Sequence, residues 1–378
     1  MRRVTISTLR ICLVADSLER RGGADRSLVL LANALAERGH RVTALLRARG
    51  GSVEGTHPRV AIEVLPTATG DTRRWIRVPA LVFSLTRRLR DIDPDVVVAF
   101  KPENAIPALL AATIARVPMV VSERVSLADH KHYWHWRLGR RLMYGRAAAL
   151  VAQTERLVAD ARRLAPKASI HVVPNMVVIP AGTNGGSVWD RFPSGRPQGR
   201  LITIGRLAQQ KGLDRLIDAF ADLALAVPEW CLAIIGAGPL QDDLDHRISA
   251  AGLDDRVKLM GAVDDPFPSL RDSHVFALAS RYEGFPNALL EAMSVGLAVV
   301  AYDCPTGPRE LIDDEANGLL IPDGATRAFA DGLLRAMTDE SLRSRLGARA
   351  KRAAEEFAPE RIVGRWEAVL REAASPRR

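Results

Sequence analysis

The sequence predicts a doubly wound α/β fold with two domains. The chain of 378 residues is longer than the roughly 100 to 200 residues of a typical single domain. Short apolar runs of strand length alternate with segments of helical periodicity, and this pattern stops once and then restarts. Buried strands separated by helices form parallel sheets that are covered on both faces, so two such sheets are expected.

The first domain is predicted over residues 1–178. After the first strand, a helix is indicated by the apolar spacing from residue 28 to residue 35. Strands are predicted at residues 11–15, 42–46, 61–65, 96–100, 119–122, 149–153 and 170–173. Residues 179–198, which include NGG and SVWDRFPSG, carry turn-forming residues and little periodicity, and they are interpreted as a linker.

The second domain is predicted over residues 199–357, where the alternation restarts. A helix is indicated from about residue 213 to residue 220. Strands are predicted at residues 200–204, 231–235, 257–260, 275–278, 299–301 and 318–321. The last segment, residues 358–378, has a helical apolar spacing and is expected to cross back to the first domain.

Charge is distributed unevenly between the two halves. Residues 1–178 hold 29 Lys and Arg against 15 Asp and Glu, a net charge of +14, and the remainder holds 24 against 29, a net charge of −5. An anionic surface or substrate would therefore meet the first domain, although a general bias toward arginine explains the excess equally well. No apolar run approaches the roughly 20 residues of a membrane span. Three cysteines without CxxC spacing predict a reduced, cytoplasmic protein without structural zinc.

Loops after strands are where ligands bind in such sheets. Gly205 and Arg206 follow the first strand of the second domain, and Lys211 precedes the next helix. Two cations and a helix N-terminus suit a diphosphate, while two solvated cations on a surface loop are the alternative.

Two further glycine pairs follow strands in the same way. Gly236 and Gly238 lie in the sequence GAGP, and Gly22 and Gly23 lie between the first strand and the first helix. Because glycine has no side chain, a ligand could approach the backbone closely at these positions. Tight turns are the plainer interpretation of the same glycines.

The stretch SRYEGFPNALLEAM at residues 280–293 contains two glutamates eight positions apart. Pro286 suits the first turn of a helix, so Glu283 is expected on a loop and Glu291 two turns inside the helix. A hydrolytic pair needs both carboxyl groups on one bond, about 5 to 9.5 Å apart, which this arrangement does not require. The two glutamates are interpreted as contacts to opposite ends of an extended ligand, or else as surface residues of an amphipathic helix.

Five motifs in order resemble glycosyltransferase family 4. They are GGA at 22–24, GRLAQQKG at 205–212, GAGP at 236–239, EGFPNALLE at 283–291 and DCPTGPREL at 303–311. The resemblance covers nearly the whole chain. It implies the GT-B fold of two Rossmann-like domains facing a cleft, and the retaining, metal-independent transfer of a sugar from a nucleotide diphosphate donor to an acceptor hydroxyl, with no cofactor besides that co-substrate.

The resemblance also implies roles for the matched residues. Arg206 and Lys211 would hold the donor diphosphate, Glu283 would bind sugar hydroxyls and Glu291 the ribose. The remaining donor contacts would come from a set of backbone positions, namely Gly22, Gly23, Gly205, Gly236, Gly238, Phe285, Pro286, Asn287 and Ala288.

One position departs from the family pattern. Many members have a histidine after the strand at 119–122, whereas this chain has Glu123 and Arg124. This feature resembles a subgroup that uses UDP-hexoses or UDP-N-acetylhexosamines in surface polysaccharide assembly. Glu123 or Arg124 would then contact the donor sugar or the acceptor.

The acceptor in many relatives is lipid-linked, which implies a peripheral position at the inner face of a membrane. Residues 130–146 and 73–88 mix aromatic and basic side chains, which is typical of contact with anionic lipid. Internal packing of these segments is the alternative. Two other functions stay open at this point: a nucleotide-sugar epimerase of the same architecture, and a basic nucleic-acid-binding protein.

Overall fold

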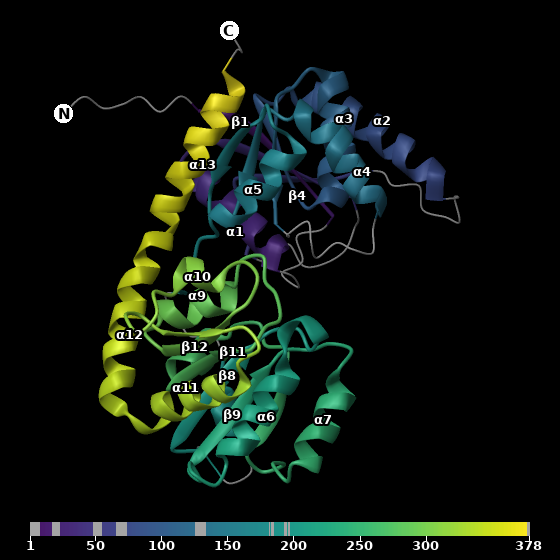
Figure 1. Cartoon of the computed structure of the whole chain (residues 1–378). Helices are drawn as coiled ribbons and strands as arrows, with labels where there is room; N and C mark the ends of the chain where they lie inside the picture. Colours follow the sequence, from purple (N-terminus) through teal and green to yellow (C-terminus); the bar gives the residue numbers. More distant parts are fainter. Residues whose placement is uncertain are drawn as a thin grey trace, which may run out of the picture. The chain divides into compact units, whose positions relative to one another are not determined.

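A computed structural model gives the fold (Figure 1). It describes residues 8–16, 23–47, 55–65, 74–124, 134–180, 182, 185–192, 195 and 197–375. The chain divides into two compact units, the first made of residues 1–176 and 359–378 and the second of residues 177–358.

Unit 1 is built on a parallel sheet of seven strands in the order β3-β2-β1-β4-β5-β6-β7. Strand order reverses beside β1, as in doubly wound folds. The strands are β1 (Arg10–Ala15), β2 (Arg41–Leu46), β3 (Val60–Val64), β4 (Val96–Phe100), β5 (Met119–Glu123), β6 (Ala149–Ala152) and β7 (Ser169–Val172). All residues of β4, β5 and β6 are buried, which explains their continuous rather than alternating hydrophobicity.

Helices connect these strands. They are α1 (Gly23–Glu37), α2 (Arg74–Ile92), α3 (Pro102–Ala115), α4 (Trp134–Met143), the short 3₁₀ turn η1 (Tyr144–Arg146) and α5 (Glu155–Leu164). Buried leucines of α2 and α3, such as Leu85 and Leu109, pack in one core with Cys12 and Val14 of β1. Thr154 caps α5, because its hydroxyl accepts a hydrogen bond from the Leu157 N–H.

The chain returns to unit 1 in its last helix, α13 (Pro359–Ala374). This helix contacts α1, β4 and β5, and Trp366 stacks on Phe100 with ring centroids 5.9 Å apart. Glu367 of α13 pairs with two groups near the end of α1: it lies 2.7 Å from Arg38 and 2.8 Å from Nε2 of His40. The return of the final helix therefore agrees with its apolar spacing.

Unit 2 contains a parallel sheet of six strands in the order β10-β9-β8-β11-β12-β13. The strands are β8 (Gly199–Ile204), β9 (Trp230–Ile235), β10 (Val257–Gly261), β11 (Val275–Leu278), β12 (Ala298–Asp303) and β13 (Leu319–Pro322). The helices are α6 (Leu213–Leu223), α7 (Gln241–Ala250), α8 (Phe267–Arg271), α9 (Asn287–Ser294), α10 (Pro308–Leu311), α11 (Thr326–Thr338) and α12 (Glu340–Ala354), with 3₁₀ turns η2 (Val188–Arg191), η3 (Gln209–Lys211) and η4 (Glu355–Phe357).

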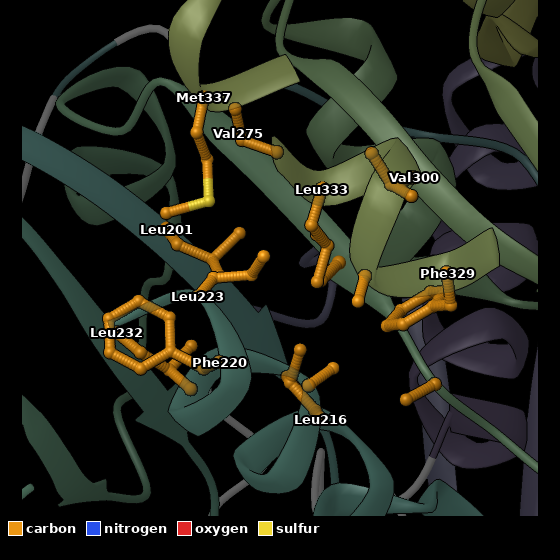
Figure 2. Packing of buried hydrophobic residues seen from close by; sticks show 14 of the residues in the cluster. Leu201, Leu216, Phe220, Leu223, Leu232, Val275, Val300, Phe329, Leu333 and Met337 are labelled. Carbon is orange, nitrogen blue, oxygen red and sulfur yellow. The ribbon is translucent and has the colours of Figure 1, made fainter. Parts of the chain in front are cut away.

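Two hydrophobic clusters hold this sheet, and Figure 2 shows part of the first. In that cluster, helices α6 and α11 pack against side chains of the strands such as Val300. The helical residues shown are Leu216 and Phe220 of α6 and Phe329 and Leu333 of α11. Helices thus bury one face of the sheet, as the apolar spacing of residues 213–220 predicts.

The segment expected as a linker differs from that expectation. Residues 179–198 belong to unit 2, and η2 begins a tightly packed turn there. Val188, Trp189 and Phe192 are buried in the second core cluster, and the Trp189 indole donates hydrogen bonds to the Ser269 carbonyl at 3.2 Å and the Ser273 hydroxyl at 3.0 Å. The turn-rich composition concealed these three buried apolar residues, because they span little more than one helical turn, which is too short for a periodicity to be recognised.

Every apolar run interpreted as a strand is one, within two residues at either end. The doubly wound α/β class with two Rossmann-like units is confirmed. Within the described ranges, none of the helices combines the length and the apolarity that crossing a bilayer requires.

Candidate functional site

The candidate site lies at the carboxyl ends of β8 and β11, the two strands between which the order of the second sheet reverses. β8 leads through α6 to β9 on one side, and β11 leads through α9 to β12 on the other. The connections diverge at this point, which leaves room above the strand ends for a ligand. The loops here are residues 205–212 and 279–286, which contain most of the site residues predicted from the sequence.

Lys211 and Glu283 meet across these two loops. Lys211 Nζ lies 2.7 Å from Glu283 Oε1, and the Ser280 hydroxyl donates to the same oxygen at 2.6 Å. The Glu283 side chain is only 5% exposed and that of Lys211 is 20% exposed. Among the residues that the structure describes, none donates a hydrogen bond to Oε2 of Glu283. The described residues therefore hold Oε1 of Glu283 with two donors and Oε2 with none.

A neighbouring loop fixes the backbone of Glu283 from both sides. The Glu283 N–H donates to the Pro305 carbonyl at 3.2 Å, and the Thr306 hydroxyl donates to the Glu283 carbonyl. Thr306 has a φ of 62°, which is costly for a β-branched residue, and Gly307 follows at 101°. A Cβ at Gly307 would lie 2.5 Å from Cδ of Pro286, so only glycine fits there. The loop at residues 303–308 (DCPTGP) therefore holds the loop at residues 283–286 (EGFP) in position through these contacts.

Sequence reasoning missed Ser280 and Thr306 as parts of this site. Both lie within motifs that were recognised, but serine and threonine hydroxyls in loops usually serve turns, and spacing alone does not single them out. A signal was available in Ser280, three residues before Glu283. A hydroxyl this near to a buried carboxylate is a common donor to it.

The glycines of the second domain have a structural purpose that the sequence did not reveal. Gly236 has a φ of 148°, and a Cβ there would overlap the carbonyl oxygen of Gly205. A Cβ at Gly238 would overlap the carbonyl oxygen of Leu207 in the same loop. These glycines let two loops pack against each other. Their predicted contact with a donor stays a prediction, since tight packing of the loops already requires them.

Lys211 and Arg206 differ in their surroundings. The aliphatic stem of Lys211 crosses Gly205, where a Cβ would come within 3.1 Å of it. Arg206 is exposed, and no carboxylate of the described chain pairs with it. The site thus has one positioned cation and one that is available to an anionic ligand.

Glu291 lies on the helix that follows the Glu283 loop. Pro286 precedes α9 rather than beginning it, so the helix starts at Asn287 and Glu291 lies little more than one turn inside, not two. Glu291 is buried, as is Phe285, whose ring packs 6.0 Å from that of Phe357. With its ring turned into the core, Phe285 can offer only its backbone to a ligand. Ala288, next along α9, is partly exposed.

In unit 1, Glu123 is engaged inside the protein. Its Oε2 lies 3.1 Å from Nε of the fully buried Arg140 and accepts a hydrogen bond from the Tyr144 hydroxyl at 3.0 Å. Burial, followed by the charge of Glu123, raises the pKa of Tyr144 well above its usual value. Arg140 and Tyr144 therefore follow the alternative of internal packing, because they neutralise and solvate a buried carboxylate. Residues 130–133 lie outside the described residues, and contact of this segment with a membrane stays a prediction.

Arg124 is buried as well. Its guanidinium lies 3.7 Å from the centroid of the Phe100 ring, and it donates to the Ser122 hydroxyl at 3.1 Å and to the Asn175 side chain. Burial lowers the pKa of Arg124, and the nearby charge of Glu123 opposes this shift. A structural role accounts for these contacts, and contact of Glu123 or Arg124 with a sugar stays a prediction.

Gly22 lies outside the described residues, and Gly23 is the first residue of α1. Two ion pairs surround this end of the first sheet: Lys101 with Asp25 at 2.7 Å, and Arg47 with Asp16 at 2.9 Å. Lys101 has a φ of 67° immediately before α3. These charged residues, which the sequence reasoning did not identify, follow β1, β2 and β4 and the start of α1. They place polar groups at the carboxyl edge of unit 1.

Comparison with known proteins agrees with this geometry. The family model "Glycosyl transferase 4-like domain" matches residues 22–176, and "Glycosyl transferases group 1" matches residues 190–353. An exopolysaccharide phosphotransferase of Streptomyces coelicolor is 29% identical over 94% of this chain, which spans only 40% of that protein's length. The lipopolysaccharide core biosynthesis glycosyltransferase LpsE of Rhizobium meliloti is 30% identical over 87% of this chain and 89% of its own.

Similar folds occur among solved structures. Anabaena HepE, crystallised with UDP and glucose, superposes with a TM-score of 0.81 over 96% of this chain and 99% of its own, at 21% identity. Fold, motif order and sequence similarity point to the same conclusion. The chain is a GT-B glycosyltransferase and belongs to glycosyltransferase family 4.

Proposed function

We propose that the enzyme transfers a hexose or N-acetylhexosamine, with retention, from a UDP-linked donor to an acceptor hydroxyl in polysaccharide assembly. The observation that carries this proposal is Glu283, held on one oxygen by Lys211 and Ser280 and open on the other, at the switch point of the second sheet. Support for UDP comes from HepE, whose structure holds UDP and glucose, and support for a polysaccharide product comes from the names of the two relatives.

The arrangement of charges suits a donor that carries a diphosphate. Lys211 already neutralises Glu283, so a sugar hydroxyl can donate to Oε2 without leaving an unpaired charge in a buried place. Arg206 and Lys211 together would offset the negative charge that grows on the diphosphate as the glycosidic bond breaks. We therefore propose a metal-independent reaction without a further cofactor, in which these two cations stabilise the leaving group.

The two glutamates would then bind opposite ends of one donor. Glu283 would orient the sugar and Glu291 would accept hydrogen bonds from the ribose hydroxyls. The backbone between them, from Phe285 to Ala288, would pass beside the sugar and the phosphate. Retention would follow if the acceptor hydroxyl enters on the face that the diphosphate leaves, with the departing phosphate oxygen taking up the acceptor proton.

For the acceptor we propose a lipid-linked glycan, which places the enzyme at the cytoplasmic face of a membrane. The excess of positive charge in residues 1–178 supports this proposal, since lipid-linked diphosphates and anionic bilayers are both negative.

Product analysis tests the proposal. Purified enzyme is incubated with UDP-glucose, UDP-galactose, their N-acetyl forms and GDP-mannose, with and without a lipid extract as acceptor, and UDP release and anomeric configuration are measured. An α-linked product from an α-linked donor is expected, and Glu283→Gln should lower its formation at least tenfold. Isomerised donor without transfer would instead establish an epimerase.

A further inference from the structure

The two loops of the candidate site, which carry Lys211 and Glu283, are also joined by hydrogen bonds beside that pair. The Arg281 N–H donates to the Gln210 carbonyl at 2.8 Å, and the Gln210 side-chain amide donates to the Tyr282 carbonyl at 3.0 Å. These two hydrogen bonds run in opposite directions between the loops. The loops are therefore paired at the residues that immediately precede Lys211 and Glu283 in the sequence.

The side chain of Arg281 adds an ion pair to this connection. Its guanidinium binds Asp214 through two nitrogens: Nη1 lies 2.8 Å from Oδ1, and Nη2 lies 2.6 Å from Oδ2. Nη1 also donates to the Gln209 carbonyl at 2.9 Å. Gln209 begins the 3₁₀ turn that ends at Lys211, and Asp214 lies in the first turn of α6. The planar guanidinium thus holds the segment that contains Lys211 on both sides of that residue.

Gly212, directly after Lys211, brings the two loops into close contact. Its φ is 59°, and a Cβ there would overlap the carbonyl oxygen of Ala279. Glycine adopts this left-handed backbone at little cost, so the chain can turn from η3 into α6 here. Lys211 therefore lies between a carbonyl that Arg281 holds and a glycine that has no room for a side chain.

The ion pair between Arg281 and Asp214 is charged at physiological pH. The hydrogen bond from Arg281 is the main cause that lowers the pKa of Asp214, against an opposing effect of burial. The hydrogen bond to Asp214 is likewise the main cause that raises the pKa of Arg281. The two side chains are 28% and 34% exposed, and ion pairs this exposed contribute little to the free energy of unfolding. Loss of the pair should therefore alter the loops more than it alters the stability of unit 2.

A second ion pair beside this one provides a matched comparison. Arg215 lies 3.0 Å from Asp323, and their side chains are 25% and 37% exposed, close to the values for Arg281 and Asp214. This pair joins α6 to the residue that follows β13, in a loop other than that of Glu283. Substitution of Arg215 thus removes an arginine of similar exposure from the same helix without removing the bridge between the two loops.

We propose that Arg281 and Asp214 are positioning residues that hold Lys211 against Glu283 and toward the donor diphosphate. The inference rests on the proposed function, and it adds two residues that act through Lys211. A cation stabilises the charge on a departing diphosphate most effectively when it is already in place, because no reorganisation is then needed during bond breaking. The bridge between the loops supplies this preorganisation.

Competitive labelling with acetic anhydride tests the position of Lys211 without any donor. Lys101 of unit 1 is the internal reference, because it also lies 2.7 Å from a carboxylate and its side chain is 24% exposed, against 20% for Lys211. Mass spectrometry of the labelled full chain gives the ratio of acetylated Lys211 to acetylated Lys101. Arg281→Ala and Asp214→Asn should each raise this ratio about threefold or more, because Lys211 is then less firmly held, and Arg215→Ala should leave it unchanged. An unchanged ratio in both loop variants would overturn the proposal.

Steady-state release of UDP tests whether Arg281 acts through Lys211. Arg281→Ala should lower kcat about tenfold, Arg281→Lys should recover part of the loss because it keeps the charge, and Arg215→Ala should retain the wild-type kcat. In enzyme that already carries Lys211→Ala, adding Arg281→Ala should change kcat less than about twofold, since no cation remains to be positioned. Losses that simply multiply would contradict the proposal. Thermal melting confirms that each variant is folded.

Failure of the proposed function gives a different result from failure of this inference. A wild type that releases UDP from none of the donors, together with a labelling ratio that rises in Arg281→Ala, would contradict the donor assignment and support the positioning of Lys211. A wild type that transfers sugar, together with an Arg281→Ala enzyme of unchanged kcat and labelling ratio, would support the transferase and rule out the positioning role.

Discussion

At the scale of single residues, the position of Glu283 is fixed by the groups that surround it. Ser280 and Lys211 converge on Oε1, and the loop at Pro305 and Thr306 holds its backbone. Burial is the main cause that raises the pKa of the neighbouring Cys304 thiol to about 12, and the charge of Glu283 adds to it. The thiol is thus neutral at physiological pH and serves as an apolar side chain beside the carboxylate.

Ser280→Ala tests the positioning of Glu283. Losing one donor to a buried carboxylate should lower kcat about tenfold while leaving KM for the donor nearly unchanged, because sugar contacts tighten in the transition state. Steady-state kinetics with saturating acceptor gives both constants. Ser280→Thr, which keeps a hydroxyl, should recover part of the rate, and a Ser280→Ala enzyme with wild-type kcat would contradict the assignment.

Lys211→Ala should behave differently. Lys211 is proposed to face the donor diphosphate, and removing such a cation weakens ground-state binding as well as binding of the transition state. Both KM and kcat are therefore expected to change, each by about tenfold or more. Lys211→Arg keeps the positive charge but changes the shape of the cationic group, so it distinguishes the effect of charge from the effect of geometry. An unaltered KM for the donor in Lys211→Ala would place the diphosphate elsewhere.

At the scale of elements, the sequence predicted strands and helices well, because doubly wound strands are continuous apolar runs bounded by turns. Residues 96–100 match β4 at both ends. Long-range partners were not predictable in the same way. Glu123 and Arg140 are 17 positions apart and meet only through tertiary packing, in which α4 lies against α3. Local spacing does not distinguish Arg140 from the exposed Arg141. The site was therefore predicted by motif, and its supporting residues were not.

The final helix should contribute strongly to the stability of unit 1. Trp366 is buried and stacks on Phe100, so Trp366→Ala leaves a large cavity and is expected to lower the free energy of unfolding by about 3 kcal/mol or more. Urea denaturation followed by circular dichroism measures the change. Arg365→Ala, at an exposed position of the same helix, should change it by less than about 0.5 kcal/mol.

His274, just before β11, makes the stability of unit 2 depend on pH. Burial first, and then the charges of Arg200 and Arg343, lower the pKa of His274 from 6.5 to about 4, against a smaller opposing effect of Glu340. Between pH 4 and pH 6.5 the unfolded chain binds more protons than the folded protein does. The contribution of His274 to the free energy of unfolding is therefore fully present above pH 6.5 and is lost as the pH falls toward 4. The urea midpoint should decline over this range, and the decline should be shallower in His274→Gln. An identical pH profile in that variant would contradict this account.

At the scale of the whole molecule, the proposed donor site and the excess of positive charge lie in different units. Unit 2 holds the proposed donor site at the switch point of its sheet, and unit 1 carries the surplus of positive charge. Each half has its own sheet and core, and the chain passes from unit 1 to unit 2 and back once through α13.

The central claim is that the carboxyl edge of the second sheet binds a UDP-sugar between Glu283 and Glu291. Thermal unfolding with and without UDP-sugars tests it most directly, because a ligand at 100 times its Kd stabilises the folded protein by about 2.7 kcal/mol. The wild type should melt several degrees higher with at least one UDP-hexose or UDP-N-acetylhexosamine, and Glu291→Ala should lose most of that shift. An unchanged melting temperature with every UDP-sugar, or an equal shift in Glu291→Ala, would contradict the claim.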